Sequence, residues 1–445
     1  MDNSHSERQR HIPAEQVSLE ISERFGANRV TLPEPALGTS EVMACATAFP
    51  ENAAELGEML SYASSQRWRV VPAGARTWLE MGNPPTEVHL IVSTAKMTRI
   101  LEYEPADLTA TVEAGCTLST FNAGSEPHRQ FIPLDPFGAE NGTLGAIVAT
   151  GSFGTLRCGF GTPRDWVIGM RVARGDGTIT KAGGKVVKNV AGYDLCKLYT
   201  GSFGTLGVIC ELSFKLRALP ASDRTIVLAS DQIAELCAFA SRIVDSDLQP
   251  AAMEIFAPAA VGLSDLVEGE YAIALRFLDE EETIDSEEEY IGQLSGALRC
   301  RTLEREQAVE MWQTYRASET DSRWVWNLRV SVLPTDVAEM VNEIQNLMPS
   351  SAVCLHAGNG VIRVFDETAS LEQLKTAQRP RKVAELRQFA QARGGQLIIL
   401  RAPEEIMEKL DVWGDVGQTA RLMRELKAKF DPQAILNPGR FVAGI

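Results

Sequence analysis

The feature that most constrains the fold is a glycine-dense stretch in the first half of the chain. Residues 138–207 hold 16 of the 35 glycines in 70 of the 445 positions. The hexapeptide Gly-Ser-Phe-Gly-Thr-Leu occurs there twice, at 151–156 and 201–206, and Gly-Thr-Leu-Gly occurs at 142–145 and 204–207. Because glycine admits positive φ and lets another group approach the backbone closely, the stretch predicts a main chain wrapped around an anionic or flat ligand. Tight β-turns without a ligand are the alternative.

The local charge agrees with an anionic ligand. Residues 157–197 contain eight Lys or Arg and three Asp, a net +5, whereas the whole chain carries −16. A nucleic-acid-binding protein would present a broad basic face, and 59 acidic against 43 basic residues argue against one. We therefore predict a phosphate-bearing cofactor and no nucleic-acid partner.

Length and composition narrow the class further. A chain of 445 residues with 44% hydrophobic residues predicts two domains, or one larger domain with an insertion. No run of about 18 apolar residues occurs, so no membrane span is expected, and the polar N-terminus lacks the apolar segment of a secretory signal. The eight cysteines are scattered without a CxxC pair, which favours reduced cytoplasmic thiols over an Fe–S or zinc site.

Hydrophobic spacing predicts a change of architecture near residue 222. Before it, we expect helices over 14–25 and 51–66 and strands over 68–71, 89–93, 109–113 and 208–216. After it, glycine thins out and expected strands alternate with helices, with a hairpin at Gly358-Asn359-Gly360. The expected strands are 226–228, 251–256, 271–277, 328–333, 353–357, 361–365 and 397–400, and the expected helices are 231–244, 281–298, 336–348, 371–393 and 419–430. This second region is predicted to be an antiparallel sheet with helices on one face.

Several motifs resemble one flavoprotein family. Ala191-Gly192-Tyr193-Asp194-Leu195, followed by 201–209, resembles the FAD-binding domain of the vanillyl-alcohol-oxidase/PCMH (VAO/PCMH) flavoproteins. Residues 185–195 and Leu436-Asn437-Pro438-Gly439-Arg440 are most similar to the FAD-binding subunits of bacterial glycolate oxidases. The resemblance covers 42–220 and 431–441 and is looser between them.

The resemblance implies an α+β fold with two α+β FAD subdomains and an inserted antiparallel-sheet cap. It implies a polar N-terminal extension over 1–41, an FAD-binding domain over 42–222, a cap over 223–415 and a C-terminal return to the FAD domain over 416–445. The implied cofactor is FAD. It is expected to be non-covalent, because no histidine lies in the 72–78 loop or near 150.

The resemblance also implies which residues bind FAD. Main-chain amides are expected to hold the pyrophosphate, and a side chain at Gly145 is expected to push the phosphates away. The two segments expected to supply these amides comprise Pro72, Ala73, Gly74, Ala75, Arg76 and Thr77, and Gly142, Thr143, Leu144, Gly145 and Ala146. Contacts to the flavin, ribityl chain or adenine are expected from Thr150, Gly151, Ser152, Val208, Ile209 and Asn437, with Pro136, Gly204 and Gly207 completing the site. Lys188 either neutralises phosphate or is a solvated charge, and the loop 72–77 alone is a weak motif.

Catalytic candidates come from the cap. Arg329 and Arg401 lie on expected cap strands and either hold a carboxylate or are surface charges. Catalytic relatives carry a pattern like His-x-Gly-Asp-Gly-x-x-His whose histidines hold a divalent metal. Here His356 is present, Asn359 replaces the acid, Arg363 replaces the second histidine, and no histidine follows. No two-histidine metal site is expected, and Arg363 is a candidate anchor for a carboxylate.

His356 has two interpretations, a structural hydrogen bond or a flavin-facing acid/base. Because arginine cannot accept the hydroxyl proton, we expect the chain alone to oxidise glycolate slowly.

The function implied by the resemblance is oxidation of glycolate to glyoxylate in a complex. Its expected partners are a sister FAD subunit and an Fe–S subunit, in the cytoplasm and attached to the inner membrane through partners. The alternatives are a stand-alone FAD oxidoreductase for another alcohol or hydroxy acid, and a non-catalytic scaffold for a sister subunit.

Overall fold

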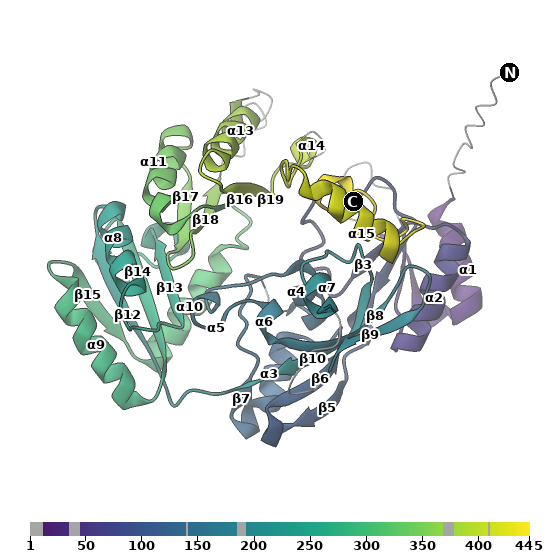
Figure 1. Cartoon of the computed structure of the whole chain (residues 1–445), viewed down its shortest axis with the longest axis horizontal. Helices are drawn as coiled ribbons and strands as arrows, with labels where there is room; N and C mark the ends of the chain where they lie inside the picture. Colours follow the sequence, from purple (N-terminus) through teal and green to yellow (C-terminus); the bar gives the residue numbers. More distant parts are fainter. Residues whose placement is uncertain (1–11, 35–44, 139–140, 185–192, 368–377, 408–409) are drawn as a thin grey trace.

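The computed structural model describes residues 12–34, 45–138, 141–184, 193–367, 378–407 and 410–445. Figure 1 shows two lobes, with the C-terminal segment lying back over the first lobe. Lys188, most of the motif around it and the first eleven residues lie outside the described residues. The predicted domain limits at 41, 222 and 415 stay predictions.

The first lobe begins with a four-stranded sheet in the order β1-β2-β4-β3. Its strands are β1 Val30–Glu34, β2 Cys45–Ala48, β4 Leu90–Ser93 and β3 Val70–Ala73. Helices α1 (Ala14–Phe25) and α2 (Ala53–Ser65) pack on it, as the sequence predicted. Asn52 caps α2 by accepting a hydrogen bond from the Glu55 amide at 3.0 Å. Since β2 and β3 both pair in parallel with β4, α2 is the crossover that brings the end of β3 toward the glycine-rich region.

A second sheet of the first lobe is antiparallel, in the order β5-β6-β10-β8-β9. Its strands are β5 Ile100–Glu104, β6 Thr109–Glu113, β10 Val208–Lys215, β8 Val167–Ala173 and β9 Ile179–Gly183. Helices α3 (Leu118–Ser125), α4 (Leu144–Thr150) and α7 (Leu195–Tyr199) contribute to the core on one of its faces. Sequence analysis did not identify β8 and β9, because their glycines and the burial of β8 depart from simple alternation.

The cap is one eight-stranded antiparallel sheet in the order β15-β12-β14-β13-β17-β18-β16-β19. Its strands are β12 Ser222–Ser230, β13 Ala252–Phe256, β14 Tyr271–Asp279, β15 Arg299–Leu303, β16 Trp326–Ser331, β17 Ala352–His356, β18 Val361–Asp366 and β19 Gln396–Arg401. The expected hairpin joins β17 to β18, pairing His356 with Val361. The α+β class and the antiparallel cap sheet are therefore confirmed.

The expectation that cap helices cover one face is wrong for one helix. Helices α8 (Ile233–Val244), α9 (Glu281–Ser295), α11 (Val337–Leu347) and α13 (Gln378–Gln391) pack on one face. Helix α10 (Arg305–Ser318), which sequence analysis missed, packs on the other. Residues of β12 alternate accordingly: Ile226 joins the first core, whereas Thr225 accepts a hydrogen bond from Trp312 Nε1 of α10 at 2.9 Å. The α10 core also contains Phe137 of the first lobe, so this face of the cap lies against that lobe.

The C-terminal return forms hydrogen bonds with separate parts of the first lobe. The amide of Val70 in β3 donates to the Ile435 carbonyl at 2.7 Å, and the Asn437 amide donates to the Val70 carbonyl at 2.8 Å. Before this segment, helix α15 (Thr419–Phe430) buries Lys427. Its Nζ donates to the Thr205 carbonyl, the Leu436 carbonyl and the Asp431 carboxylate at 2.8, 2.7 and 2.6 Å. No helix among the described residues is both long enough and apolar enough to span a bilayer.

Candidate active site

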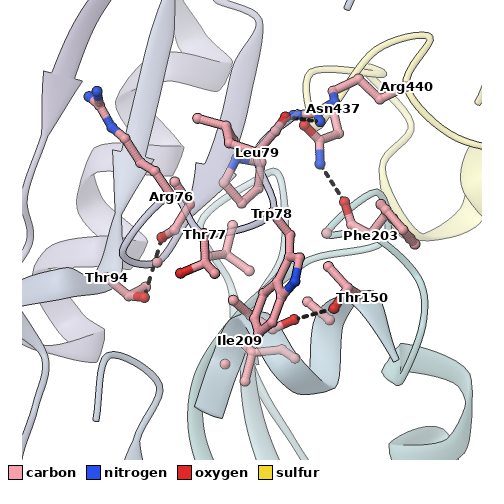
Figure 2. Close-up of a pocket in the computed structure, with 18 of the residues that line it drawn as sticks. Arg76, Thr77, Trp78, Leu79, Thr94, Thr150, Phe203, Ile209, Asn437 and Arg440 are labelled. Atoms are coloured by element: carbon pink, nitrogen blue, oxygen red, sulfur yellow. Dashed lines mark hydrogen bonds between the residues drawn. The ribbon is translucent and has the colours of Figure 1, made fainter. Parts of the chain in front are cut away.

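A cavity lies where β3, α4, the start of β10 and the C-terminal return meet. The space between its walls is about 670 Å³, part of it open to solvent, and Figure 2 shows these walls. It is lined by Pro72, Ala73, Gly74, Arg76, Thr77, Trp78, Leu79, Thr94, Gly145, Ala146, Ala149, Thr150, Phe203, Gly204, Gly207, Val208, Ile209, Asn437 and Arg440. Glycine and alanine make up a large part of this set, so main chain forms much of the wall.

Close approach of two backbone segments explains the glycine at 74. A Cβ there would lie 2.1 Å from Thr143 Oγ1, so only glycine fits without movement. Thr143 caps α4 and accepts from the Ala146 amide at 3.3 Å, so its side chain is already fixed. The loop after β3 is thereby pressed against the first turn of α4.

Gly145 is tight for a reason that sequence analysis did not predict. A Cβ at this position would lie 2.7 Å from the Cβ of Ala114 and 2.8 Å from its carbonyl oxygen. The predicted clash with phosphates stays a prediction. A side chain at Gly145 would first displace α4 from the residue that follows β6.

The charge of this cavity suits an anion. Its lining contains Arg76 and Arg440 and, among the described residues, no Asp, Glu, His, Cys or Tyr. The buried Arg440 donates to the carbonyls of Leu79 and Met81 at 2.5 and 2.6 Å, and burial lowers its pKa to about 10. The side chain stays cationic at neutral pH. Arg76 donates to Thr47 Oγ1 at 2.7 Å, and in Figure 2 its guanidinium points away from Trp78 and Thr150.

The two copies of the hexapeptide lie side by side but face different spaces. A Cβ at Gly151 would come within 3.4 Å of the Gly201 Cα. The Gly201 amide donates to the Val148 carbonyl at 2.9 Å, at the C-terminal end of α4. Phe203 of the second copy lines the first cavity, whereas Phe153 of the first copy lines a second one.

The second cavity lies between the first lobe and the cap. The space between its walls is about 920 Å³, part of it open to solvent, and it shares Thr77 and Trp78 with the first cavity, so the two spaces adjoin. The first lobe contributes Thr77, Trp78, Glu80, Met81, Phe137, Ser152 and Phe153, and the segment from Glu319 onward contributes Glu319, Thr320, Asn327, Arg329, Arg363, Leu400 and Arg401.

Three arginines point from neighbouring cap strands into this cavity. Arg329 on β16 is the cross-strand partner of Arg363 on β18, and Arg401 on β19 pairs with Asn327, two residues before Arg329. The pleat therefore places all three on one face of the sheet. Like charges placed directly opposite destabilise a sheet, so this arrangement needs an anion or a counter-charge.

Only one of these three arginines lacks a partner within the part of the chain that the structure describes. Arg363 Nη2 pairs with Glu319 Oε2 at 2.5 Å, and Arg401 donates to the Asp321 carbonyl at 3.1 Å. Arg329 has no hydrogen bond or ion pair with any described residue and lies 5.8 Å from the Phe153 ring centre. Burial, with the nearby charges of Arg363 and Arg157, lowers the Arg329 pKa to about 10. It remains a cation at neutral pH and is the side chain best suited to hold a carboxylate.

His356 lies behind the second cavity and lines neither of the two. It is 3% exposed, and the ring centres of Phe137 and Phe153 both lie 5.7 Å from its own. Its Nδ1 lies 2.5 Å from Glu254 Oε1, and Glu254 Oε2 accepts from the Tyr315 hydroxyl at 2.9 Å. This geometry favours the interpretation of His356 as a structural hydrogen-bonding residue.

Burial shifts both members of this pair toward their neutral forms. It lowers the pKa of His356 to about 4 and raises the pKa of Glu254 well above its ordinary value. Burial therefore favours an uncharged carboxyl and an uncharged imidazole over an ion pair at this contact. Across the described ranges, no group of three or more His, Cys, Asp or Glu side chains is placed to hold a metal ion.

The predicted cofactor residues separate into three groups. Those that line the first cavity are Pro72, Ala73, Gly74, Arg76, Thr77, Gly145, Ala146, Thr150, Gly204, Gly207, Val208, Ile209 and Asn437. Those that do not are Ala75, Pro136, Gly142, Thr143, Leu144, Gly151 and Ser152, and Lys188 lies outside the described residues. The reasons are local: Leu144, the first residue of α4, is buried in the core, Pro136 bridges to Gly154, and Ser152 lines the second cavity.

Sequence analysis missed several lining residues. In the first cavity these are Trp78, Leu79, Thr94, Ala149, Phe203 and Arg440, and in the second the most important is Glu319. Phe203 and Arg440 belong to motifs already quoted, so the motif itself could have identified them. Glu319 follows the unpredicted helix α10, and nothing local in the sequence points to it.

Comparison with known proteins gives two family matches. Residues 44–183 match the family described as FAD binding domain, and residues 219–370 with 415–441 match FAD linked oxidases, C-terminal domain. The glycolate oxidase subunit GlcD of Bacillus subtilis (strain 168) is 28% identical, over 94% of this chain and 93% of its own. The subunit GlcE of Escherichia coli (strain K12) is also 28% identical, over 87% of this chain and 96% of its own. A D-lactate dehydrogenase of Archaeoglobus fulgidus is 28% identical, over 88% and 90%.

Solved structures share the fold. The 4-ethylphenol oxidase from Gulosibacter chungangensis has a TM-score of 0.75 at 15% identity, covering 97% of this chain and 98% of its own. The p-cresol methylhydroxylase with substrate bound has a TM-score of 0.75 at 13% identity, covering 96% of each chain. The predicted VAO/PCMH-type fold and the resemblance to this flavoprotein group are confirmed.

Proposed function

We propose that this chain, which belongs to the FAD-linked oxidases, binds FAD non-covalently in the first cavity and oxidises a 2-hydroxy acid held in the second. The observation that carries the proposal is the junction of the two cavities at Thr77 and Trp78, with the unpartnered Arg329 facing the second. A redox cofactor and an anionic substrate would meet there.

The first cavity fits FAD in its donor set and its charge. Main chain drawn close by Gly74 and Gly204 offers amides to a pyrophosphate, and no carboxylate among the described lining residues repels it. The described lining also offers no His, Cys or Tyr side chain as a covalent attachment point, which supports non-covalent binding. When bound, FAD supplies the hydride acceptor.

The residues of the second cavity would bind and orient the substrate. Arg329 holds the carboxylate by two parallel N–H donors, while Phe137 and Phe153 form an apolar wall that excludes water. Glycolate, the smallest 2-hydroxy acid, is the first candidate substrate, and glyoxylate is then the product. The similarity to two glycolate oxidase subunits supports this choice and a place in a complex.

In that complex, electrons would pass from this chain toward a sister FAD subunit and an Fe–S subunit. The proposed location is the cytoplasm, with attachment to the inner membrane through the partners. A stand-alone oxidoreductase for another alcohol or hydroxy acid and a non-catalytic flavin-binding scaffold are the competing functions.

Two measurements test the proposal. Acid precipitation of the purified yellow protein should release all flavin to the supernatant, and colour left in the pellet would disprove non-covalent binding. Anaerobic mixing with glycolate, D-lactate or D-2-hydroxyglutarate should bleach the flavin absorbance in a single turnover. If no 2-hydroxy acid bleaches it, alone or with co-purified partners, the scaffold function replaces the enzymatic one.

A further inference from the structure

We propose that Glu319 is the general base of this site, accepting the proton of the substrate hydroxyl on Oε1. The inference rests on the proposed oxidation of a 2-hydroxy acid. It supplies the proton acceptor that Arg363, which stands in place of a second histidine, cannot provide.

The position of Glu319 meets the geometric requirement. It caps the C-terminal end of α10 and lines the second cavity together with Arg329. Although the residue is only 3% exposed, its Oε1 has no hydrogen-bond partner among the described residues, whereas its Oε2 accepts from Arg363 at 2.5 Å. A buried carboxylate oxygen without a donor is costly, and a substrate hydroxyl would supply that donor.

Arg363 then acts as a positioning residue. Its guanidinium already pairs with Glu319, so it is less available than Arg329 to hold a substrate carboxylate. It fixes the rotamer of Glu319 and turns Oε1 away from the ion pair. In this chain Arg363 stands where catalytic relatives have the second histidine, and its partner Glu319 can accept a proton without a metal.

The surroundings adjust the basicity of Glu319 in two directions. Burial raises its pKa above the ordinary value, and the charge of Arg363 opposes that shift. A base whose pKa lies nearer to neutral pH is better matched to proton transfer. The other groups in the same electrostatic network are His356, Glu254, Tyr315, Cys354, Arg157 and Asp135.

The step balances without a further reactant. The O–H bond of the substrate breaks and its proton goes to Glu319, while the C2–H bond breaks and its electron pair leaves as hydride to the oxidised flavin. A C=O bond forms between C2 and its oxygen, which gives the 2-oxo acid. This route needs no metal. If Glu319 is the base, we therefore expect the chain alone to oxidise its substrate at a rate that a chelator does not change, in place of the slow turnover expected from the sequence.

The first test is the pH profile of flavin reduction by the best 2-hydroxy acid. The wild-type rate should rise with pH, because Glu319 must be deprotonated to accept a proton. E319Q should be slower by about 10²-fold or more and lose this acidic limb. R363Q should keep the limb but move it to higher pH, because the charge that lowers the Glu319 pKa is gone. An unchanged limb in E319Q, or an unmoved limb in R363Q, would overturn the proposal.

A second measurement does not depend on turnover. Oxalate, an anion that mimics the bound acid, should bind the FAD-loaded wild type more weakly as pH rises, because Glu319 gains a negative charge. In E319Q this pH dependence should disappear while binding persists. If oxalate affinity of the wild type and E319Q changes equally with pH, Glu319 is not in the site. If oxalate behaves as expected but no 2-hydroxy acid reduces the flavin, the proposed oxidation fails and the base has no reaction to serve.

Discussion

The two cavities are built in opposite ways. The first is formed largely by main chain and small side chains from the loop after β3, from α4 and from the second hexapeptide. The second is formed by large and charged side chains, seven of which lie in or before the cap strands β16, β18 and β19. Backbone walls suit a cofactor whose shape does not vary, whereas side-chain walls allow substrate and chemistry to change by substitution.

The difference predicts which kind of substitution disrupts each cavity. In the first cavity an added side chain is the damaging change, because close approach is what the glycines provide. In the second a removed charge is the damaging change, because Arg329 has no substitute with a free guanidinium among the described lining residues.

The largest effect is expected from Ala146→Glu in the first cavity. Ala146 lines the cavity at the third position of α4, and its amide donates to the capping Thr143. Glutamate at this position completes a capping box, so the helix should remain folded. Its carboxylate should repel the pyrophosphate and weaken FAD binding by about 100-fold or more, measured by fluorescence titration of flavin-free protein.

Ala123→Glu is the matched control. Ala123 also lies on a helix of the first lobe, in α3, but is exposed and lines neither cavity. This variant should bind FAD as the wild type does. Equal FAD affinity of the two glutamate variants would show that the cofactor lies elsewhere.

The same contrast explains what could be predicted from the sequence. Glycine spacing and the family motifs identified much of the first cavity, because a backbone cradle is encoded locally by the residues that form it. The second cavity depends on the pairing of β16 with β18 and β19, which brings residues 329, 363 and 401 together. The arginines were noted as candidates, but their arrangement and the role of Glu319 required the sheet register and helix α10.

A smaller but clear effect is expected from Arg329→Met in the second cavity. Methionine keeps much of the length of the side chain and removes the charge, so FAD content should be unchanged. The substrate carboxylate loses its bidentate donor, and KM for the 2-hydroxy acid should rise by about 10- to 100-fold. Steady-state dye reduction measures this change.

Arg329→Lys separates charge from geometry. Lysine restores the positive charge without the planar fork, so its KM should lie between those of the wild type and Arg329→Met. A KM for Arg329→Met equal to that of the wild type would transfer the anchoring role to Arg401 or Arg363.

The smallest effect is a change in stability with pH. It concerns Glu254 and His356, the buried pair behind the second cavity, and not the charged side chains that line that cavity. We expect the folded pair to keep its proton on Glu254 and to leave His356 neutral, because burial raises the first pKa and lowers the second to about 4. In the unfolded chain they titrate near their ordinary values of 4.5 and 6.5. Between these values both states hold one proton on the pair, so the contribution of the pair to stability is flat. Above 6.5 the unfolded chain loses that proton first, and stability falls by up to about 1.4 kcal/mol per pH unit.

Glu254→Gln should reverse this profile. Glutamine can still accept from Tyr315 and donate to His356, but it does not titrate. His356 is then the only titrating member of the pair. Because its pKa is lowered in the folded protein, its contribution to stability is complete above pH 6.5 and is lost as the pH falls toward 4. Compared with the wild type at saturating FAD, the variant should gain urea resistance between pH 7 and 8.5 and lose it between pH 6.5 and 5. Parallel denaturation midpoints of the two proteins across this range would show that the folded pair holds no proton above pH 6.5, and would contradict a proton kept between Glu254 and His356.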